Sequence, residues 1–124
     1  MKKVFLGLCV GVLLMGCRAA VPIHDVKHQV VPVKDAKVVE KAIIAGSMKR
    51  GWEVSKTGPQ VFQAVLDHKT LHVEVEIPYG EDYYSIIYKQ SENLKYNGEK
   101  GVIHPRYNTW ILNLKRAINA SIIR

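Results

Sequence analysis

The feature that most constrains the fold of this chain is a strict alternation of apolar and polar residues near its middle. Every second residue from Leu71 to Ile77 is apolar, and the residues between them are polar: His72, Glu74 and Glu76. Because successive side chains of a strand point to opposite faces, this pattern predicts a β-strand with one face buried and the other in water. We expect the polar face to stay open.

Segments on both sides of this strand indicate three more strands. Residues 52–55 alternate in the same way, and residues 61–66 follow a Thr-Gly-Pro turn signal. Residues 83–89 are rich in aromatic and β-branched side chains. The connections are too short for the crossovers that parallel strands require, so we expect a four-stranded antiparallel meander.

Two segments with a helical period lie before and after the strands. The first covers residues 35–50, with Asp35 as its cap and Gly51 at its end. The second covers residues 105–123, in which apolar residues fall on one stripe. We therefore expect an α+β fold of helix, four-stranded antiparallel meander and C-terminal helix, in two layers with both helices on one sheet face. Residues 90–102, polar and rich in glycine, are expected to form a loop.

The amino-terminal residues have the pattern of an export signal. Lys2 and Lys3 precede an apolar run over residues 4–16, which is shorter than the roughly 20 residues that a membrane-spanning helix needs. The run ends in Leu-Met-Gly-Cys at residues 14–17, which resembles the lipobox of bacterial lipoproteins. In that motif a small residue before the cysteine lets the backbone enter the processing peptidase.

The lipobox implies a processed, lipid-anchored protein. We expect residues 1–16 to be a signal peptide and Cys17 to carry acyl chains such as palmitate, which anchor the protein in a membrane. An ordinary secretory signal that contains a cysteine is the alternative. Arg18 stands where lipoproteins held at the inner membrane tend to have aspartate. The sequence therefore resembles lipoproteins sent to the outer membrane, where the protein would face the periplasm.

The chain from Cys17 onward divides into a tether and one domain. Residues 17–33 are rich in valine, contain Pro22 and Pro32 and lack a helical period, so we expect an extended tether. Residues 34–124 are expected to form a single α+β domain. This domain contains no cysteine, so its stability must come from a packed core.

The charge of the chain argues against a nucleic-acid partner. The formal net charge is +7, and removing Lys2 and Lys3 leaves sixteen basic residues against eleven acidic ones, an excess of five. These basic residues are spread along the chain without the clustering that is typical of a nucleic-acid surface.

A set of short motifs covers most of the predicted domain. They are Gly51-Trp52, Ile77-Pro78-Tyr79, Tyr84-Ser85-Ile86-Ile87-Tyr88, Ser91 with Asn93-Leu94-Lys95-Tyr96, and Ile103-His104-Pro105-Arg106-Tyr107-Asn108-Thr109-Trp110-Ile111. In these motifs the chain resembles a family of small, uncharacterised proteobacterial lipoproteins. The resemblance implies the membrane-anchored compartment and the α+β fold, and it implies no activity.

One segment concentrates the side chains that could bind a ligand. The candidate binding residues are Tyr88, Ser91, Tyr96, His104, Tyr107, Asn108 and Trp110. They could line a pocket in which aromatic faces stack on a ligand while polar groups orient it. Alternatively, His104 caps the last helix and the rings pack on the sheet. We favour the second interpretation.

The sequence gives little support for catalysis or metal binding. Ser85 or Ser91 with His104 and Asp82 could be combined into a triad, but no nucleophile-elbow motif is present. A zinc site could use His68, His72 and His104 as ligands, but no established ligand spacing occurs. We therefore expect no catalytic residue, no metal and no cofactor.

Two classes of function remain. We expect a lipid-anchored envelope protein with a non-enzymatic binding or structural role toward an envelope protein, lipid or glycan. The alternative is a small ligand carrier or enzyme with a pocket around Tyr88, Tyr96, His104 and Tyr107. The predicted partners are the membrane, through the acyl chains, and an envelope component, but not nucleic acid.

Overall fold

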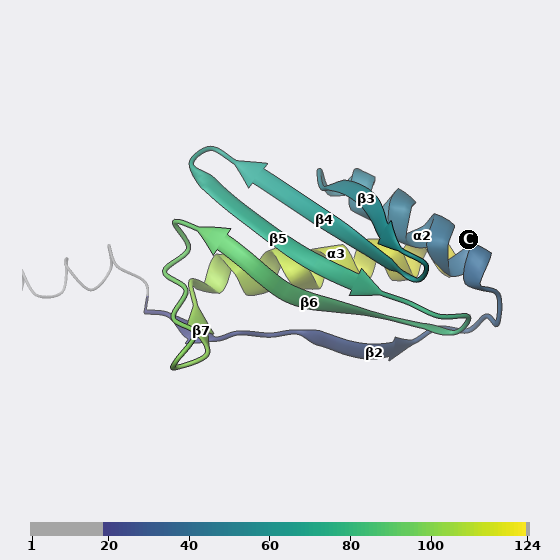
Figure 1. Ribbon diagram of the computed structural model, residues 1–124, viewed down its shortest axis with the longest axis horizontal. Coiled ribbons are helices and arrows are strands. Elements are labelled where there is room, and N and C mark those ends of the chain that lie inside the picture. The colour runs from purple at the N-terminus through teal and green to yellow at the C-terminus, as the bar shows by residue number, and fades with distance from the viewer. Residues whose placement is uncertain (1–18, 124) are drawn as a thin grey trace, which may run out of the picture.

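The computed structural model describes residues 19–123 (Figure 1). The predicted signal peptide and the predicted lipid-attachment residue Cys17 lie outside the described residues. The elements in chain order are β1 (Val21–Pro22), β2 (Val26–Val30), α2 (Ala36–Lys49), β3 (Glu53–Gly58), β4 (Val61–His68), β5 (Leu71–Pro78), β6 (Tyr83–Glu92), β7 (Val102–Ile103) and α3 (Pro105–Ile123).

The described chain has the predicted α+β class but more strands than predicted. The larger sheet has five antiparallel strands in the order β2-β6-β5-β4-β3, and β1 pairs with β7 in a second sheet of two strands. The four strands of the expected meander are neighbours in sequence order, as Figure 1 shows. The prediction of a four-stranded sheet was wrong because β2 adds to the edge of β6.

The prediction of a tether over residues 17–33 needs correction. This segment is extended, but it is part of the folded domain: Val26 pairs with Ile86, and the valines at positions 26 and 31 are each only 5% exposed. The register of β2 shifts after Val26, and His28 has a left-handed backbone with a φ of 51°. These irregularities break the alternation that would mark a strand. The domain therefore begins near Val21, not at residue 34.

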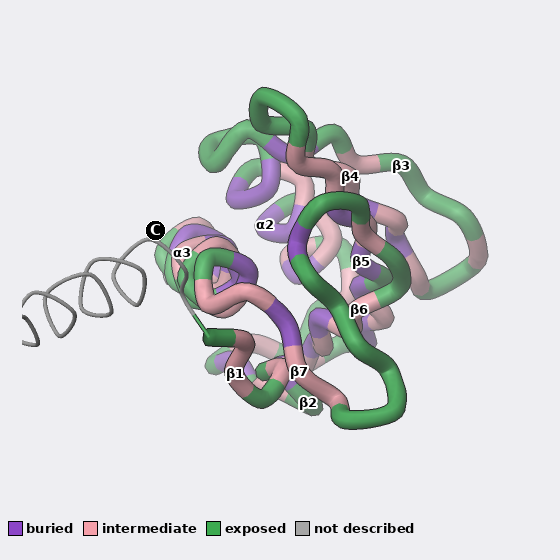
Figure 2. The backbone as a smooth tube through the Cα atoms, turned by 90° about the vertical axis from the view of Figure 1, so that its left-hand side faces the viewer, coloured by how far each residue is buried: buried purple, intermediate pink, exposed green. Residues whose placement is uncertain are grey.

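Both helices lie on one side of the larger sheet (Figure 2). The side chain of Asp35 accepts a hydrogen bond from the backbone N–H of Lys37 at 2.9 Å, and so it caps α2 as predicted. Gly51 follows the helix with a φ of 84°, a conformation that favours glycine. The strand β5 turns its apolar residues toward the helices, while His72, Glu74 and Glu76 lie on the opposite face.

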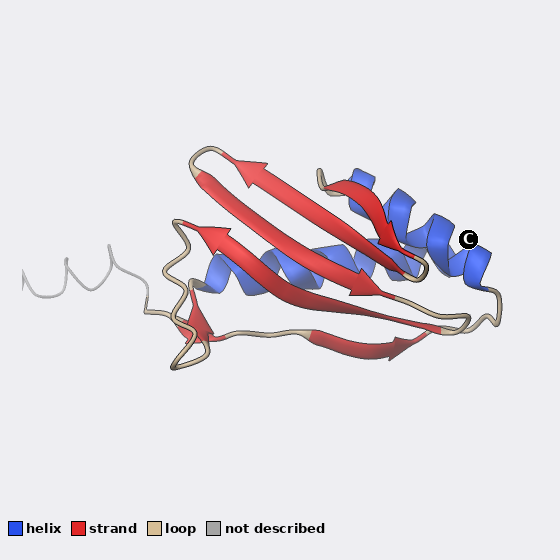
Figure 3. Cartoon of the chain, viewed as in Figure 1, coloured by secondary structure: helices blue, strands red, loops and turns tan. Residues whose placement is uncertain are grey.

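The core forms where the two helices cross and where α3 lies on the sheet. The apolar stripe predicted for α3 is fully buried, at Tyr107, Ile111, Leu114 and Ile118. Gly46 of α2 allows the helices to approach closely, because a Cβ atom there would lie 2.6 Å from the backbone nitrogen of Ile118. Residues 93–101 form a loop between β6 and β7, as Figure 3 shows, so the loop is shorter than predicted by three residues at its start and one at its end.

Candidate functional site

The structure brings three of the predicted site residues into one aromatic cluster. The rings of Tyr88 and Tyr96 stack with centroids 4.3 Å apart, and Tyr107 meets the Tyr88 ring edge-on at 5.6 Å. Strand β6 supplies Tyr88, the following loop supplies Tyr96, and the first turn of α3 supplies Tyr107. The faces that could stack on a ligand therefore contact each other.

The polar residues of the predicted site also have structural partners. The hydroxyls of Ser91 and Tyr88 lie 2.7 Å apart. His104 caps α3, because its Nδ1 accepts a hydrogen bond from the backbone N–H of Arg106 at 3.0 Å. The Asn108 side chain accepts a hydrogen bond from the backbone N–H of His24 and donates one to the backbone carbonyl of Pro22, both at 3.0 Å. Asn108 thus fixes the amino-terminal segment to α3.

Two predicted site residues differ from the others in their surroundings. Tyr107 is fully buried and its hydroxyl has no hydrogen-bond partner in the described part of the chain. Burial raises the pKa of this phenol, and the nearby Asp25 raises the pKa further. Trp110 lies outside the tyrosine cluster and meets the ring of His68 edge-on at 6.1 Å. Tyr88, Ser91, Tyr96, His104 and Asn108 thus have structural partners, whereas the Tyr107 hydroxyl has none among the described residues and Trp110 lines a small cavity beside His68.

A larger apolar groove, which the sequence analysis missed, lies between α2 and β3. Its volume is about 710 Å³, and its apolar walls include Ile44, Met48, Trp52, Val54 and Phe62. Trp52 and Phe62 are only 3% exposed and form the floor of the groove, whereas Met48 is 66% exposed. We call this feature the α2–β3 groove. Its size is in the range of sites that hold small molecules or a few side chains.

A cluster of three polar side chains borders the α2–β3 groove. Glu40 of α2 accepts hydrogen bonds from Tyr79 Oη at 2.5 Å and from Lys56 Nζ at 2.8 Å. The hydrogen bond from Lys56 lowers the pKa of the Glu40 carboxyl, and the one from Tyr79 lowers it further. The pKa of Lys56 is raised, chiefly by its hydrogen bond to Glu40. The charges at this border of the groove thus neutralise each other.

The groove had one weak signal in the sequence. Ile44 and Met48 stand four residues apart in α2, beside the stripe formed by Val39, Ala42 and Ile43 that enters the core. Two apolar residues at this spacing form a second, narrower apolar face on a helix. The ion pair between Glu40 and Lys56 at the groove could not be predicted from the sequence, because these two residues meet only in the tertiary fold.

The open sheet face carries a network around His72. Its Nδ1 lies 2.5 Å from Asp67 Oδ1, and its Nε2 lies 2.9 Å from Glu74 Oε2. Glu74 also accepts hydrogen bonds from the amides of Gln63 and Gln90, at 3.0 and 2.8 Å. The hydrogen bond to Glu74 raises the pKa of the imidazole, and the one to Asp67 raises it further. The same bond lowers the pKa of the Glu74 carboxyl. This arrangement favours the charged form of the imidazole, because two carboxylates contact its ring nitrogens.

The histidines and serines considered for metal binding and catalysis lie in separate surroundings. His68 contacts Trp110, His72 contacts two carboxylates and His104 caps α3. Ser85 Oγ accepts a hydrogen bond from the backbone N–H of His28 at 2.8 Å. Among residues 19–123, no group of three or more histidine, cysteine or acidic side chains is placed to hold a metal ion.

Comparisons with known proteins identify no relative. The chain matches no protein-family model, no curated protein and no solved structure. None of the helices within residues 19–123 is both long and apolar enough to cross a membrane.

Proposed function

We propose that the protein is a lipid-anchored component of the cell envelope with a non-enzymatic role, in which it binds an apolar, extended segment of an envelope protein. The anchor is Cys17, and the binding site is the α2–β3 groove together with the outer edge of β3. The observation that carries the proposal is the position of an apolar groove directly beside the unpaired edge of a sheet.

The composition of the groove favours an apolar partner. Met48 and Ile44 offer apolar side chains at the surface, and burying one such side chain contributes about 1.5–3 kcal/mol. A glycan would need many hydrogen-bond partners for its hydroxyl groups. The charged side chains at the groove are Glu40, Glu53 and Lys56, and two of them, Glu40 and Lys56, are already bonded to each other.

The edge of β3 favours an extended partner. Four consecutive residues, from Glu53 to Lys56, pair with β4 without a register shift, and no described strand pairs with the other side of β3. The outward backbone groups of such an edge can pair with an added strand. Lysine side chains commonly protect sheet edges from added strands. The Lys56 side chain is instead bonded to Glu40, so it is not free to protect the edge of β3 in this way. The other edge of the meander, on β6, is covered by β2.

The first experiment tests the anchor. We expect mass spectrometry of the protein purified from its native membrane to show a chain that begins at Cys17 and carries acyl groups on that residue. The Cys17→Ser variant is expected to keep residues 1–16 and to lack the acyl mass. An unmodified chain cut at another position would show that the signal is an ordinary secretory one.

The second experiment tests the groove. A photo-crosslinking amino acid at Met48 is expected to capture a discrete envelope protein, and the same probe at Leu112, which is 38% exposed on α3, serves as the matched control. A synthetic peptide that spans the crosslinked segment should bind the chain of residues 18–124. The Ile44→Asp variant should weaken this binding at least tenfold, because about 1.4 kcal/mol of apolar burial corresponds to that factor. The Leu112→Asp variant should not weaken it.

Strand addition has its own test within this experiment. N-methylation of alternate peptide amides removes the donors that would pair with β3, so it should weaken binding when the methylated amides face the edge. Binding that ignores every methylation pattern would contradict strand addition. Capture of lipid alone at Met48 would contradict the protein partner and indicate a carrier of small apolar molecules.

A further inference from the structure

We propose that the end of the domain that carries β1 and β7 is a membrane-facing surface, which contacts the anionic phospholipid headgroups of the leaflet that holds the anchor. This inference rests on the proposed lipidation of Cys17. It adds a second contact with the membrane, made by the folded domain itself, and it fixes how the domain is oriented.

The length of chain between the anchor and the fold carries the first part of the inference. Cys17 precedes Val21 by four residues, and Val21 is already paired with Ile103 in the small sheet. Four residues span at most about 14 Å when fully extended. The Debye length at physiological ionic strength is about 8 Å, so this end of the domain stays within about two Debye lengths of the membrane surface and can reach the headgroups themselves.

The β1–β7 end has an excess of basic residues. The turn between β4 and β5, the loop of residues 93–101 and the start of α3 lie at this end (Figure 1). These segments and the end of β6 carry four exposed cations, Lys69, Lys95, Lys100 and Arg106, against two exposed acids, Glu92 and Glu99. Two other acids lie near this end: Asp67 is paired with His72, and Asp25 accepts a hydrogen bond from the backbone N–H of Tyr88.

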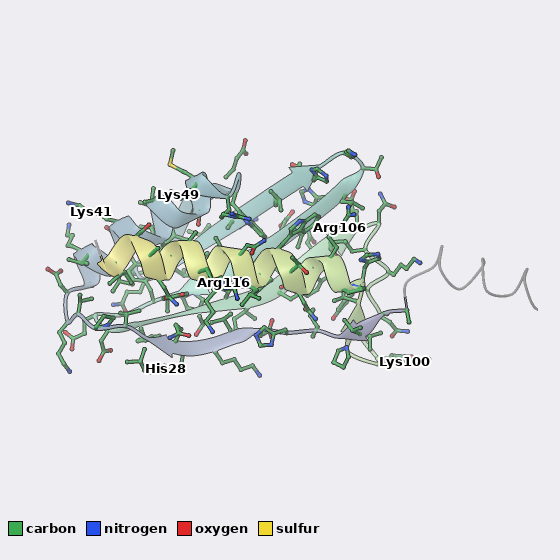
Figure 4. All side chains as sticks on the ribbon, turned by 180° about the vertical axis from the view of Figure 1, so that it is seen from behind. His28, Lys41, Lys49, Lys100, Arg106 and Arg116 are labelled. Carbon is green, nitrogen blue, oxygen red and sulfur yellow. The ribbon has the colours of Figure 1, made fainter. Side chains whose placement is uncertain are left out.

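The opposite end of the molecule lacks this basic excess. The connection before α2 and the turn between β5 and β6 carry three acidic residues against two lysines, counting residues 31–37 and 79–82. Figure 4 shows Lys100 and Arg106 toward the β1–β7 end, and Lys41 toward the other. An anionic membrane surface therefore favours the orientation in which the β1–β7 end faces the lipid. Each basic residue near the surface contributes about 1 kcal/mol to the binding free energy, which is a factor of about five in the binding constant.

The backbone holds these cations in fixed positions. Asn97 Oδ1 accepts hydrogen bonds from the backbone N–H groups of Glu99 and Lys100, at 3.0 and 3.1 Å, which orders the loop. Asn93 Nδ2 donates to the carbonyl of Thr70 at 2.7 Å, which ties the loop to the neighbouring turn. The surface is thus preorganised and does not need to fold on contact with lipid.

Two of the basic residues occupy positions that do not favour lysine. Lys69 and Lys95 have left-handed backbones, with φ values of 59° and 55°. Glycine and asparagine adopt this conformation more easily, so the turn geometry alone gives no reason for a cation. Tyr96, 45% exposed beside Lys95, adds an amphipathic ring of the kind enriched at membrane interfaces.

The test attaches the domain to lipid chemically at the residue of the proposed anchor. A chain of residues 17–124, whose one cysteine is Cys17, is coupled to a maleimide lipid in vesicles of equimolar phosphatidylglycerol and phosphatidylcholine. Amide hydrogen exchange is then compared with that on vesicles of phosphatidylcholine alone. We expect slower exchange in residues 93–101 on the anionic vesicles only, and unchanged exchange in residues 79–82.

A charge-neutralised variant and a matched control make the test specific. The Lys69→Gln, Lys100→Gln, Arg106→Gln variant should lose this protection. Without coupling, its binding to the anionic vesicles should be weaker by a factor on the order of 100, since it lacks three basic residues. The control variant Lys41→Gln, Lys49→Gln, Arg116→Gln has the same net charge, with its changes on the helices, and should keep the protection (Figure 4).

Each outcome bears on one proposal only. Protection that is equal on both kinds of vesicle, or that appears in residues 79–82, would overturn the membrane-facing surface. This result does not depend on whether cells acylate Cys17, because the coupling is chemical. Absence of acyl groups on Cys17 in the native protein would overturn the proposed anchor, whatever the vesicles show.

Discussion

At the scale of single residues, the sequence identified positions but not their roles. His104 was correctly considered as a cap for the last helix, and its ring accepts the hydrogen bond that this role requires. Tyr88 and Tyr96 were visible as unusual aromatic residues. Whether such rings stack on each other or on a ligand depends on tertiary contacts, so the sequence could not decide between the two. The role of Gly46 could not be predicted, since it depends on the close approach of Ile118 from the other helix.

His72 gives the protein a pH-dependent stability that can be measured. Its pKa is raised in the folded state, so its stabilising contribution is complete below the unfolded value of about 6.5 and is lost as the pH rises through the folded value. We expect the free energy of unfolding to fall over this range, measured by urea denaturation at a series of pH values. The pKa of Glu74 is lowered, so its contribution is lost on the acid side, as the pH falls below about 4.5 through the folded value.

Two variants separate His72 from the other histidines. The His72→Gln variant should lack the decrease in stability above about pH 6.5, because glutamine carries no titrating proton. The His68→Gln variant keeps the network with Asp67 and Glu74 and should keep the decrease. Parallel stability profiles for the wild type and the His72→Gln variant would contradict the assignment.

At the scale of elements, the length and regularity of a pattern decided whether it could be predicted. The helix α3, of 19 residues, and the strand β5, with its full alternation, were both predicted within one residue of their bounds. The strand β2 has five residues, a register shift and a left-handed histidine, so no period of two survives. The α2–β3 groove was missed because its walls, although close in the sequence, come together only when α2 packs beside β3 and β4.

The correction to the domain boundary predicts a large loss of stability on truncation. A chain of residues 34–124 lacks β2 and loses the buried Val26 and Val31, each worth about 1.5–3 kcal/mol. Its free energy of unfolding in urea should be about 3–6 kcal/mol lower than that of residues 18–124. It should also aggregate more readily, because the edge of β6 is uncovered.

A pair of substitutions in the same strand controls for effects of length. Val26→Ala removes two buried methyl groups and should cost about 1–2 kcal/mol, whereas Val30→Ala, at a position 62% exposed, should cost almost nothing. Equal stability of the two chain lengths would restore the boundary at residue 34 and reduce β2 to an accessory strand.

At the scale of the whole molecule, the parts of the proposal occupy different sides of the domain. The β1–β7 end carries the basic residues, the α2–β3 groove opens beside the helical layer, and the His72 network lies on the open sheet face. The His72 network borders the β1–β7 end, because Asp67 and His72 flank the turn between β4 and β5, whereas the groove is built on α2 and β3. The domain can therefore be held at a membrane while its groove stays accessible.

The direction of the strands has a consequence for any partner. The strands of the larger sheet run lengthwise through the molecule, and the chain enters at one end of that length (Figure 1). With this end on the bilayer, the strands stand upright, close to the membrane normal. A segment bound along β3 would then also stand upright, at a height set by the dimensions of the domain. Neighbouring copies would present their grooves at one common level above the lipid.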